Sequence, residues 1–259
     1  MRLRARNRIE LKCEDDCPVV AMLRPRSGDA QWVVAERYEV APWVPASEYV
    51  DSFGNLCQRF TLPEGESSIT VETEVEVADQ IDVDRHAAQV PAAQLPDETL
   101  AYLLQSRYCP SDMMEERARK IVKGCAPGYP QAERIQEWVR ENVEYRYGVS
   151  ESSTCAMRTL EQGAGVCRDF AHVGVALCRS LTLPARVVVG YLHGLEPMDM
   201  HAWYEVFLGG RWFAFDATQE QPRGGRVVVA HGRDAADVAF LSSYGTLEIT
   251  KMEVGVTQA

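Results

Sequence analysis

Hydrophobic and polar positions alternate along the first third of the chain, as they do in β-strands with one face in water. The alternation is nearly strict over residues 68–77 (SITVETEVEV) and partial over residues 30–40 (AQWVVAERYEV). Turn-forming residues, among them Gly54-Asn55 and Pro63 to Gly65, lie between these segments. This pattern predicts a small antiparallel β-sandwich that ends near residue 90.

The period of the pattern changes beyond residues 91–97, a stretch with two prolines that we interpret as a linker. In residues 130–143 the apolar side chains of Ile135, Trp138 and Val139 recur at helical spacing. Such a stripe is typical of an amphipathic helix that packs on a core. We therefore expect a helical region to follow the sandwich.

A second helix is predicted from residue 167 to about residue 181, where apolar residues again recur every three or four positions. Pro184 prevents it from continuing much further. Strands are expected over 185–192, 200–208 and 211–215, the last two joined by a tight Gly209-Gly210 hairpin, and a final strand over 245–256. The register of that hairpin would pair Leu208 with Arg211 and Glu205 with Ala214.

These elements predict an α+β fold with two domains. The first, residues 1–94, is expected to be an antiparallel β-sandwich. The second, residues 95–259, is expected to pack helices on an antiparallel sheet.

Composition and charge exclude several classes of function. The 259 residues carry 38 acidic and 27 basic side chains, a formal charge of −11, which argues against nucleic acid as a partner. The chain shows no apolar stretch long enough to span a membrane and no readable secretory signal. Its eight scattered cysteines suit reduced thiols, so we expect a cytoplasmic protein.

Three segments carry the candidate chemistry. Cys167 lies at the expected start of the second helix, where unpaired backbone N–H groups favour a thiolate and the N–H of Cys167 itself could donate to an oxyanion. His201 begins a strand, and Asp216 follows the next strand, diagonal to His201 across the hairpin. A thiol, an imidazole and a carboxylate so placed predict a nucleophilic Cys-His-Asp site.

Each of these residues also has a purely structural explanation when it is taken alone. Cysteine is often a small buried hydrophobe, and Asp216 could be a turn residue at a strand end. We interpret His172 as a packing residue, because five positions place it on another side of the helix from Cys167. Cys13 and Cys17 have the spacing of a metal pair, but no second pair accompanies them, so no metal site is predicted.

The same segments resemble a known family. GVCRDFAH at 165–172, HAWYEV at 201–206 and WFAFDAT at 212–218 are similar to the transglutaminase-like superfamily, in its bacterial cysteine-protease-like branch. Residues 49–55 and 59–62 resemble the β domain that precedes the core in that branch, and residues 232–238 (GRDAADV) resemble a late motif. The resemblance covers nearly the whole chain.

The resemblance implies a papain-like arrangement in which Cys167 is the nucleophile, His201 the base and acid, and Asp216 the orienting group. Ala217 departs from the proline that commonly follows the Asp. Family members act as peptidases, amidases or transglutaminases, and others are inactive scaffolds, so membership leaves the substrate open.

The hypothesis from the sequence is a cysteine peptidase or amidase that acts on a peptide or protein amide through a thioester. It requires no cofactor. Two alternatives stay open, a protein-glutamine transglutaminase and a catalytically inactive peptide-binding scaffold. The sequence does not indicate the oligomeric state.

Overall fold

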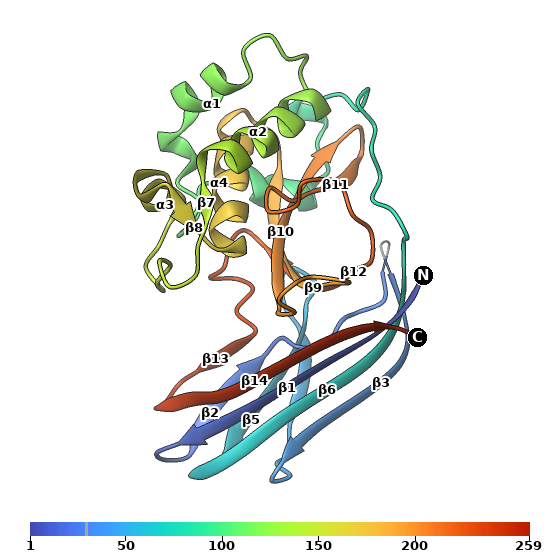
Figure 1. Cartoon of the computed structure of the whole chain (residues 1–259), viewed down its shortest axis with the longest axis vertical. Coiled ribbons are helices and arrows are strands. Elements are labelled where there is room, and N and C mark those ends of the chain that lie inside the picture. Colours follow the sequence, from blue (N-terminus) through green and yellow to red (C-terminus); the bar gives the residue numbers. More distant parts are fainter. Residues whose placement is uncertain (29–30) are drawn as a thin grey trace.

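A β-sandwich and a helix-containing core make up the computed structural model, which describes residues 1–28 and 31–259 (Figure 1). One sheet of the sandwich has the strand order β14-β1-β6-β3 and the other has the order β13-β2-β5-β4. All neighbouring strands in both sheets are antiparallel. The strands are β1 (Arg2–Cys13), β2 (Cys17–Ala21), β3 (Gln31–Ala41), β4 (Ser47–Val50), β5 (Leu56–Leu62), β6 (Gly65–Val77), β13 (Leu241–Ser243) and β14 (Leu247–Gln258).

The alternating pattern explains these strands. The segment predicted at 68–77 is the greater part of β6, and the one at 30–40 is β3, although residue 30 lies outside the described residues. The basic N-terminal residues, for which we predicted no element, form β1. Its apolar side chains face inward, whereas Arg4 and Arg6 face Glu74 and Glu72 on β6 at 3.4 and 3.3 Å.

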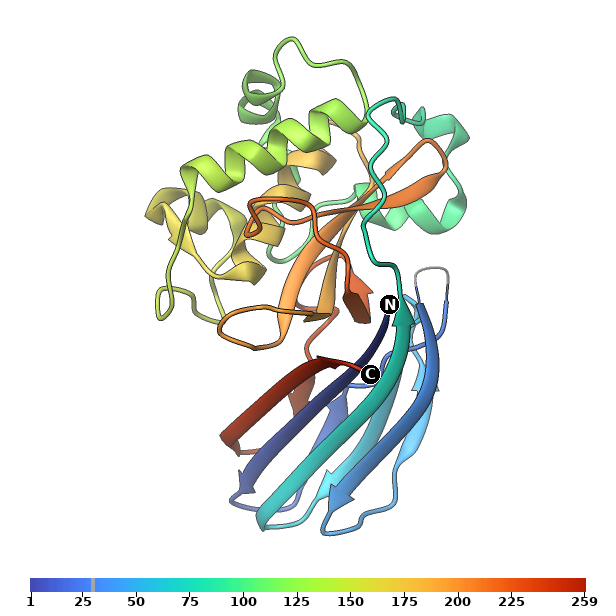
Figure 2. The ribbon, with the colours of Figure 1, turned by 45° about the vertical axis from the view of Figure 1, so that its right-hand side comes forward.

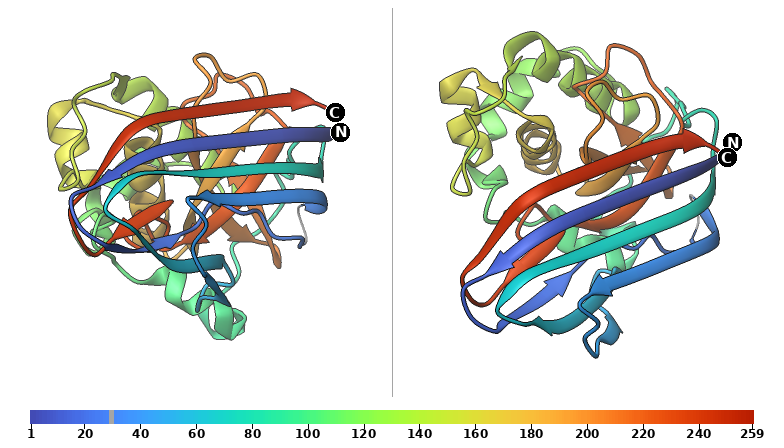
Figure 3. Two further views of the ribbon diagram at one scale, coloured as in Figure 1. Left: turned by 90° about the horizontal axis from the view of Figure 1, so that it is seen from below. Right: turned by 60° about the horizontal axis from the view of Figure 1, so that its bottom comes forward.

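The C-terminal segment returns to the N-terminal sandwich. Strand β14 pairs with β1, and β13 pairs with β2, so both ends of the chain lie at the same end of one sheet (Figure 3). The strand expected at 245–256 is thus present as β14, but it belongs to the first β unit rather than to the region that follows residue 94. The division of the chain into two domains near residue 94 stays a prediction. A second domain that begins there does not include β13 and β14, because these strands pair with strands of the sandwich.

The core consists of a four-stranded antiparallel sheet of order β11-β10-β9-β12 with helices on one face (Figure 2). The register of the β10–β11 hairpin is the predicted one, with Leu208 opposite Arg211 and Glu205 opposite Ala214. Strand β12 was not predicted. The strands and helices are β7 (Glu144–Tyr145), β8 (Ala164–Gly165), β9 (Ala185–Leu192), β10 (His201–Leu208), β11 (Arg211–Phe215), β12 (Arg226–Gly232), α1 (Glu115–Ile121), α2 (Tyr129–Asn142), α3 (Ala156–Gln162) and α4 (Cys167–Ser180), with short 3₁₀ turns at Ala92–Gln94, Asp97–Leu103 and Ser111–Met113.

Helix α4 packs directly on β10. A glycine at position 174 permits this contact, because a Cβ there would lie 2.4 Å from the ring of Tyr204. The helix is almost entirely buried within the main hydrophobic core. Close packing of α4 on β10 fixes the distance between the helix start and the strand start, which carry Cys167 and His201.

The other face of the core sheet packs on the sandwich. Apolar side chains from both units meet there: Leu3, Ala5, Val75, Val77 and Val256 from the sandwich, and Tyr191, Val227 and Val229 from the core sheet. Two side-chain amides also bind the edge strand β12 as a neighbouring strand would. Gln31 contacts both the N–H and the C=O of Val228 at 2.7 Å, and Asn55 contacts both groups of His231 at 2.9 Å.

Replacing Asn55 by alanine should reduce the free energy of unfolding by about 2 kcal/mol, because the substitution removes the partner of the partly buried backbone N–H and C=O of His231. Asn55 is 3% exposed, and its amide also donates to Asp51 at 2.9 Å. Urea denaturation of both proteins measures the difference. The matched control is Asn142→Ala at an exposed position, which should change stability little. Equal stability of the two variants would show that the contacts of Asn55 with β12 do not stabilise the fold.

Candidate active site

Cys167 is the first residue of α4, as predicted. The carboxylate of Asp169 accepts the N–H of Val166 at 2.9 Å, and Ser150 Oγ donates to its other oxygen at 3.0 Å. Gly165 leaves room for this arrangement, since a Cβ there would lie 2.7 Å from that of Asp169. These contacts fix the entry to the helix, and the half-buried Cys167 is presented in its first turn.

A cleft of about 430 Å³ opens at this helix start, and its lining includes Cys167, His201, Tyr145, Tyr147, Met200 and Thr218. Strand β7 pairs in parallel with β8 and sets Tyr145 opposite Gly165, two residues before the thiol. The Tyr145 and Tyr147 rings meet edge to face at 5.4 Å. Cys167 and His201 therefore share one surface that a substrate could reach, with an aromatic wall on one side.

His201 and Asp216 form a buried pair. The distance from His201 Nε2 to Asp216 Oδ2 is 2.8 Å, and the residues are 3% and 5% exposed. Burial lowers the pKa of His201, but hydrogen bonds to Asp216 and Cys167, together with their charges, outweigh burial and raise it to about 9. Because Nε2 faces the carboxylate, Nδ1 is the ring nitrogen available to the sulfur. The structure thus brings together all three predicted site residues.

Sequence reasoning missed three residues that surround Asp216. Arg226 Nη2 donates to Oδ2 at 2.9 Å, and Thr218 donates to Oδ1 through its N–H at 3.1 Å and its hydroxyl at 2.7 Å. Gln136, on α2, accepts the N–H of Asp216 at 2.9 Å. Burial raises the pKa of Asp216, but these donors and His201 overcome it, so the pKa lies well below its usual range. Asp216 is therefore held as a carboxylate.

Trp203 closes the inner side of the pair. The indole is 1% exposed, and its ring lies 6.1 Å from that of His201 at an interplanar angle of 25°. The guanidinium of Arg226 lies over the same indole, 5.0 Å from its centroid. A large apolar ring beside the pair excludes water from this side and strengthens its electrostatic interactions.

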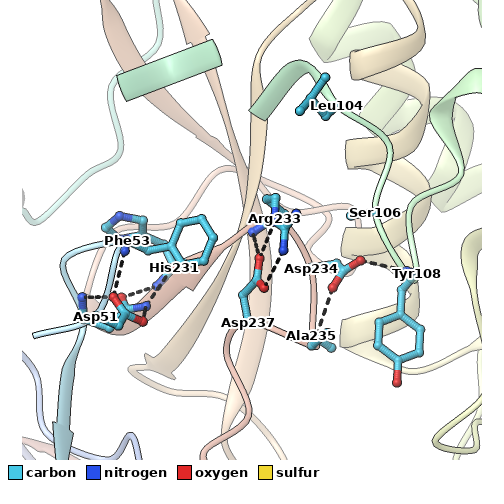
Figure 4. Close-up of polar contacts among 12 residues, drawn as sticks. Asp51, Phe53, Leu104, Ser106, Tyr108, His231, Arg233, Asp234, Ala235 and Asp237 are labelled. Atoms are coloured by element: carbon cyan, nitrogen blue, oxygen red, sulfur yellow. Dashed lines mark hydrogen bonds and ion pairs between the residues drawn. The ribbon is translucent and has the colours of Figure 1, made fainter. Parts of the chain in front are cut away.

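His172 is a buried packing residue, as we interpreted it. Burial lowers its pKa to about 3, its ring stacks on Tyr108 at 5.1 Å, and Nε2 accepts the N–H of Ala235 at 3.1 Å. Ala235 belongs to the late motif at residues 232–238. Other residues of this motif make the polar contacts drawn in Figure 4. Asp234 accepts the N–H of Tyr108 at 2.7 Å, while Arg233 and Asp237 form an ion pair at 2.9 Å. This motif anchors the loop after β12 to the helical layer.

Within residues 1–28 and 31–259, no three His, Cys, Asp or Glu side chains gather in a way that could hold a metal ion. All eight cysteines are free thiols, Cys13 and Cys17 included. Among the described helices, none is both long and apolar enough to cross a membrane.

The chain is similar to known proteins over both its N-terminal region and its core. The profile of the transglutaminase-like superfamily matches residues 115–217, and that of the bacterial transglutaminase-like N-terminal region matches residues 15–78. The crystal structure of a candidate cysteine protease from Cytophaga hutchinsonii is 33% identical, with a TM-score of 0.93 over 99% of this chain and 90% of that one. An uncharacterised protein of Mycobacterium leprae is 27% identical over 254 residues, which are 91% of this chain and 89% of the relative.

The match to the Cytophaga structure extends over the sandwich and the core alike, and the two profiles cover one unit each. The likeness therefore concerns the whole arrangement and is not limited to the segments around Cys167, His201 and Asp216. The chain belongs to the transglutaminase-like superfamily, with the bacterial N-terminal region that precedes its core.

Proposed function

We propose that this protein is a cysteine-dependent amide-bond hydrolase, a peptidase or amidase, with Cys167, His201 and Asp216 as its catalytic triad. One observation carries the proposal: at the wall of a cleft, the imidazole of His201 lies between the half-buried thiol of Cys167 at a helix start and the buried carboxylate of Asp216. This is the combination that a thiolate–imidazolium nucleophile requires.

The proposed reaction has two stages. The sulfur of Cys167 attacks the amide carbonyl and forms a C–S bond, and the oxyanion is stabilised by the N–H of Cys167 in the first turn of α4. His201 gives its proton to the nitrogen as the C–N bond breaks, and the amine leaves. His201 then takes a proton from water, whose oxygen attacks the thioester and releases the acid and the thiolate.

The acyl acceptor distinguishes this proposal from a transglutaminase. Incubation with a peptide library that contains glutamine and lysine, followed by mass spectrometry, separates the outcomes. We expect cleaved or deamidated peptides. An excess of cross-linked peptides over hydrolysed ones would show that the protein is a transglutaminase and not a hydrolase. A protein that changes no peptide and binds some of them would be the scaffold instead.

The pH dependence of kcat/KM follows from the direction of the His201 shift. The imidazolium is present below the raised pKa of His201 and is lost as the pH rises through about 9. We therefore expect kcat/KM to stay level through neutral pH and to fall at alkaline pH with an apparent pKa of about 9. Initial rates in a series of buffers test this. A decline centred near the ordinary histidine value of 6.5 would contradict it.

A further inference from the structure

Arg226, the first residue of β12, binds the carboxylate oxygen that His201 also binds. Its Nη2 lies 2.9 Å from Asp216 Oδ2, and His201 Nε2 lies 2.8 Å from the same atom. Arg226 is 8% exposed, so this ion pair is shielded from solvent. Within the described chain, Asp216 is the carboxylate in ion-pair contact with Arg226. One buried negative charge is thus shared between two cationic groups.

The position of Arg226 is fixed from several sides. Its Nε donates to the carbonyl of Arg223 at 3.0 Å, and the guanidinium lies over the ring of Trp203. The strand that carries it is held by the sandwich, through Gln31 at Val228 and Asn55 at His231. A guanidinium held in this way retains its place when the imidazole moves or titrates, so it acts as a fixed anchor for the carboxylate.

We propose that Arg226 is a positioning residue of the site: it fixes Asp216 against His201 and takes up part of the carboxylate charge, which limits how strongly His201 retains its proton. The inference rests on the proposed function, because it assigns a role within the Cys167, His201 and Asp216 triad. It also gives the N-terminal sandwich a part in catalysis, since the sandwich holds the strand that begins with Arg226.

Several charged or titratable groups lie around His201. Cys167 on α4 and Asp216 after β11 contact the ring, and Arg226 acts through Asp216. Tyr145, Tyr147, Glu196 and Asp199 line the same cleft. Removal of the Arg226 charge leaves the whole carboxylate charge to His201, so the imidazolium becomes more stable and gives up its proton less readily at neutral pH.

The test is the titration of His201, followed by NMR of the histidine rings in the full chain. In the parent protein we expect a midpoint of about 9. In Arg226→Gln and Arg226→Met the midpoint should rise by about 1 pH unit. The Arg226→Met variant keeps apolar packing on Trp203, so the same titration can be measured on it if Arg226→Gln does not fold. Arg226→Lys retains the charge and should titrate near the parent value.

Arg223→Gln is the matched control. Its guanidinium lies in the adjacent loop and bonds Gln219 and the carbonyls of His193 and Gly194 rather than Asp216. It should leave the His201 midpoint unchanged. If the parent shows the raised midpoint but neither Arg226 variant moves it upward, this inference is wrong and the triad stands. If the parent His201 titrates like an ordinary histidine, the proposed function fails with it.

Discussion

Replacing Cys167 by alanine should reduce kcat by about a million-fold and leave the fold unchanged. The sulfur is the atom that attacks in the proposed reaction, and the structure places no second thiol on the cleft surface among the described residues. The methyl group of alanine fills most of the same space in the first turn of α4, so we expect a normal melting temperature. The assay is hydrolysis of the amide substrate that the peptide library identifies.

Cys155→Ala is the control for this variant. Cys155 is also half-buried and lies directly before a helix, α3, but it does not line the cleft that holds Cys167 and His201. It should retain the activity of the parent protein. If Cys167→Ala hydrolysed the substrate as fast as Cys155→Ala, the proposed nucleophile would be wrong.

The second large effect is expected from Asp216→Asn, which should reduce kcat/KM by about a thousand-fold or more. Four donors face the carboxylate: one from His201, one from Arg226 and two from Thr218. An amide offers one acceptor oxygen, so its NH₂ group would meet donors in either orientation. The loss of charge also lowers the pKa of His201 toward its ordinary value and leaves Arg226 buried without its partner. Activity and stability should therefore both fall.

Asp237→Asn separates these two effects. Asp237 also pairs with an arginine, Arg233, but it lies in the late motif away from the cleft. This variant should lose stability and retain kcat/KM at temperatures where it is folded. Circular dichroism melts and initial rates on both variants make the comparison. Equal rates for Asp216→Asn and the parent would exclude Asp216 from the mechanism.

The features that sequence predicted well are those that depend on local spacing. The apolar stripe after Cys167 and the stop at Pro184 define α4, which ends at Ser180. The Gly209-Gly210 turn sets the hairpin register, and with it the neighbourhood of His201 and Asp216. Neighbouring residues decide each of these features, so a local pattern contains the information.

The features that sequence missed depend on contacts between distant segments. Strand β14 pairs with β1, and nothing near residue 250 indicates that partner. Arg226 contacts Asp216 because β12 pairs with β9. The sequence around residue 226 does not indicate this strand pairing. The strand β1 is hard to recognise in the sequence because its outward side chains are mostly basic. Glutamates of β6 pair with Arg4 and Arg6 only in the folded sheet.

The most direct test of the central claim is the rate at which iodoacetamide alkylates each cysteine at mildly acidic pH. Cys125, Cys155 and Cys167 are the three partly exposed thiols, so the chain contains its own references. Mass spectrometry of digested protein assigns the label. We predict that Cys167 reacts at least about tenfold faster than the other two, and that His201→Ala removes the difference. Equal labelling of all three in the parent protein would show that Cys167 is an ordinary thiol and would contradict the account.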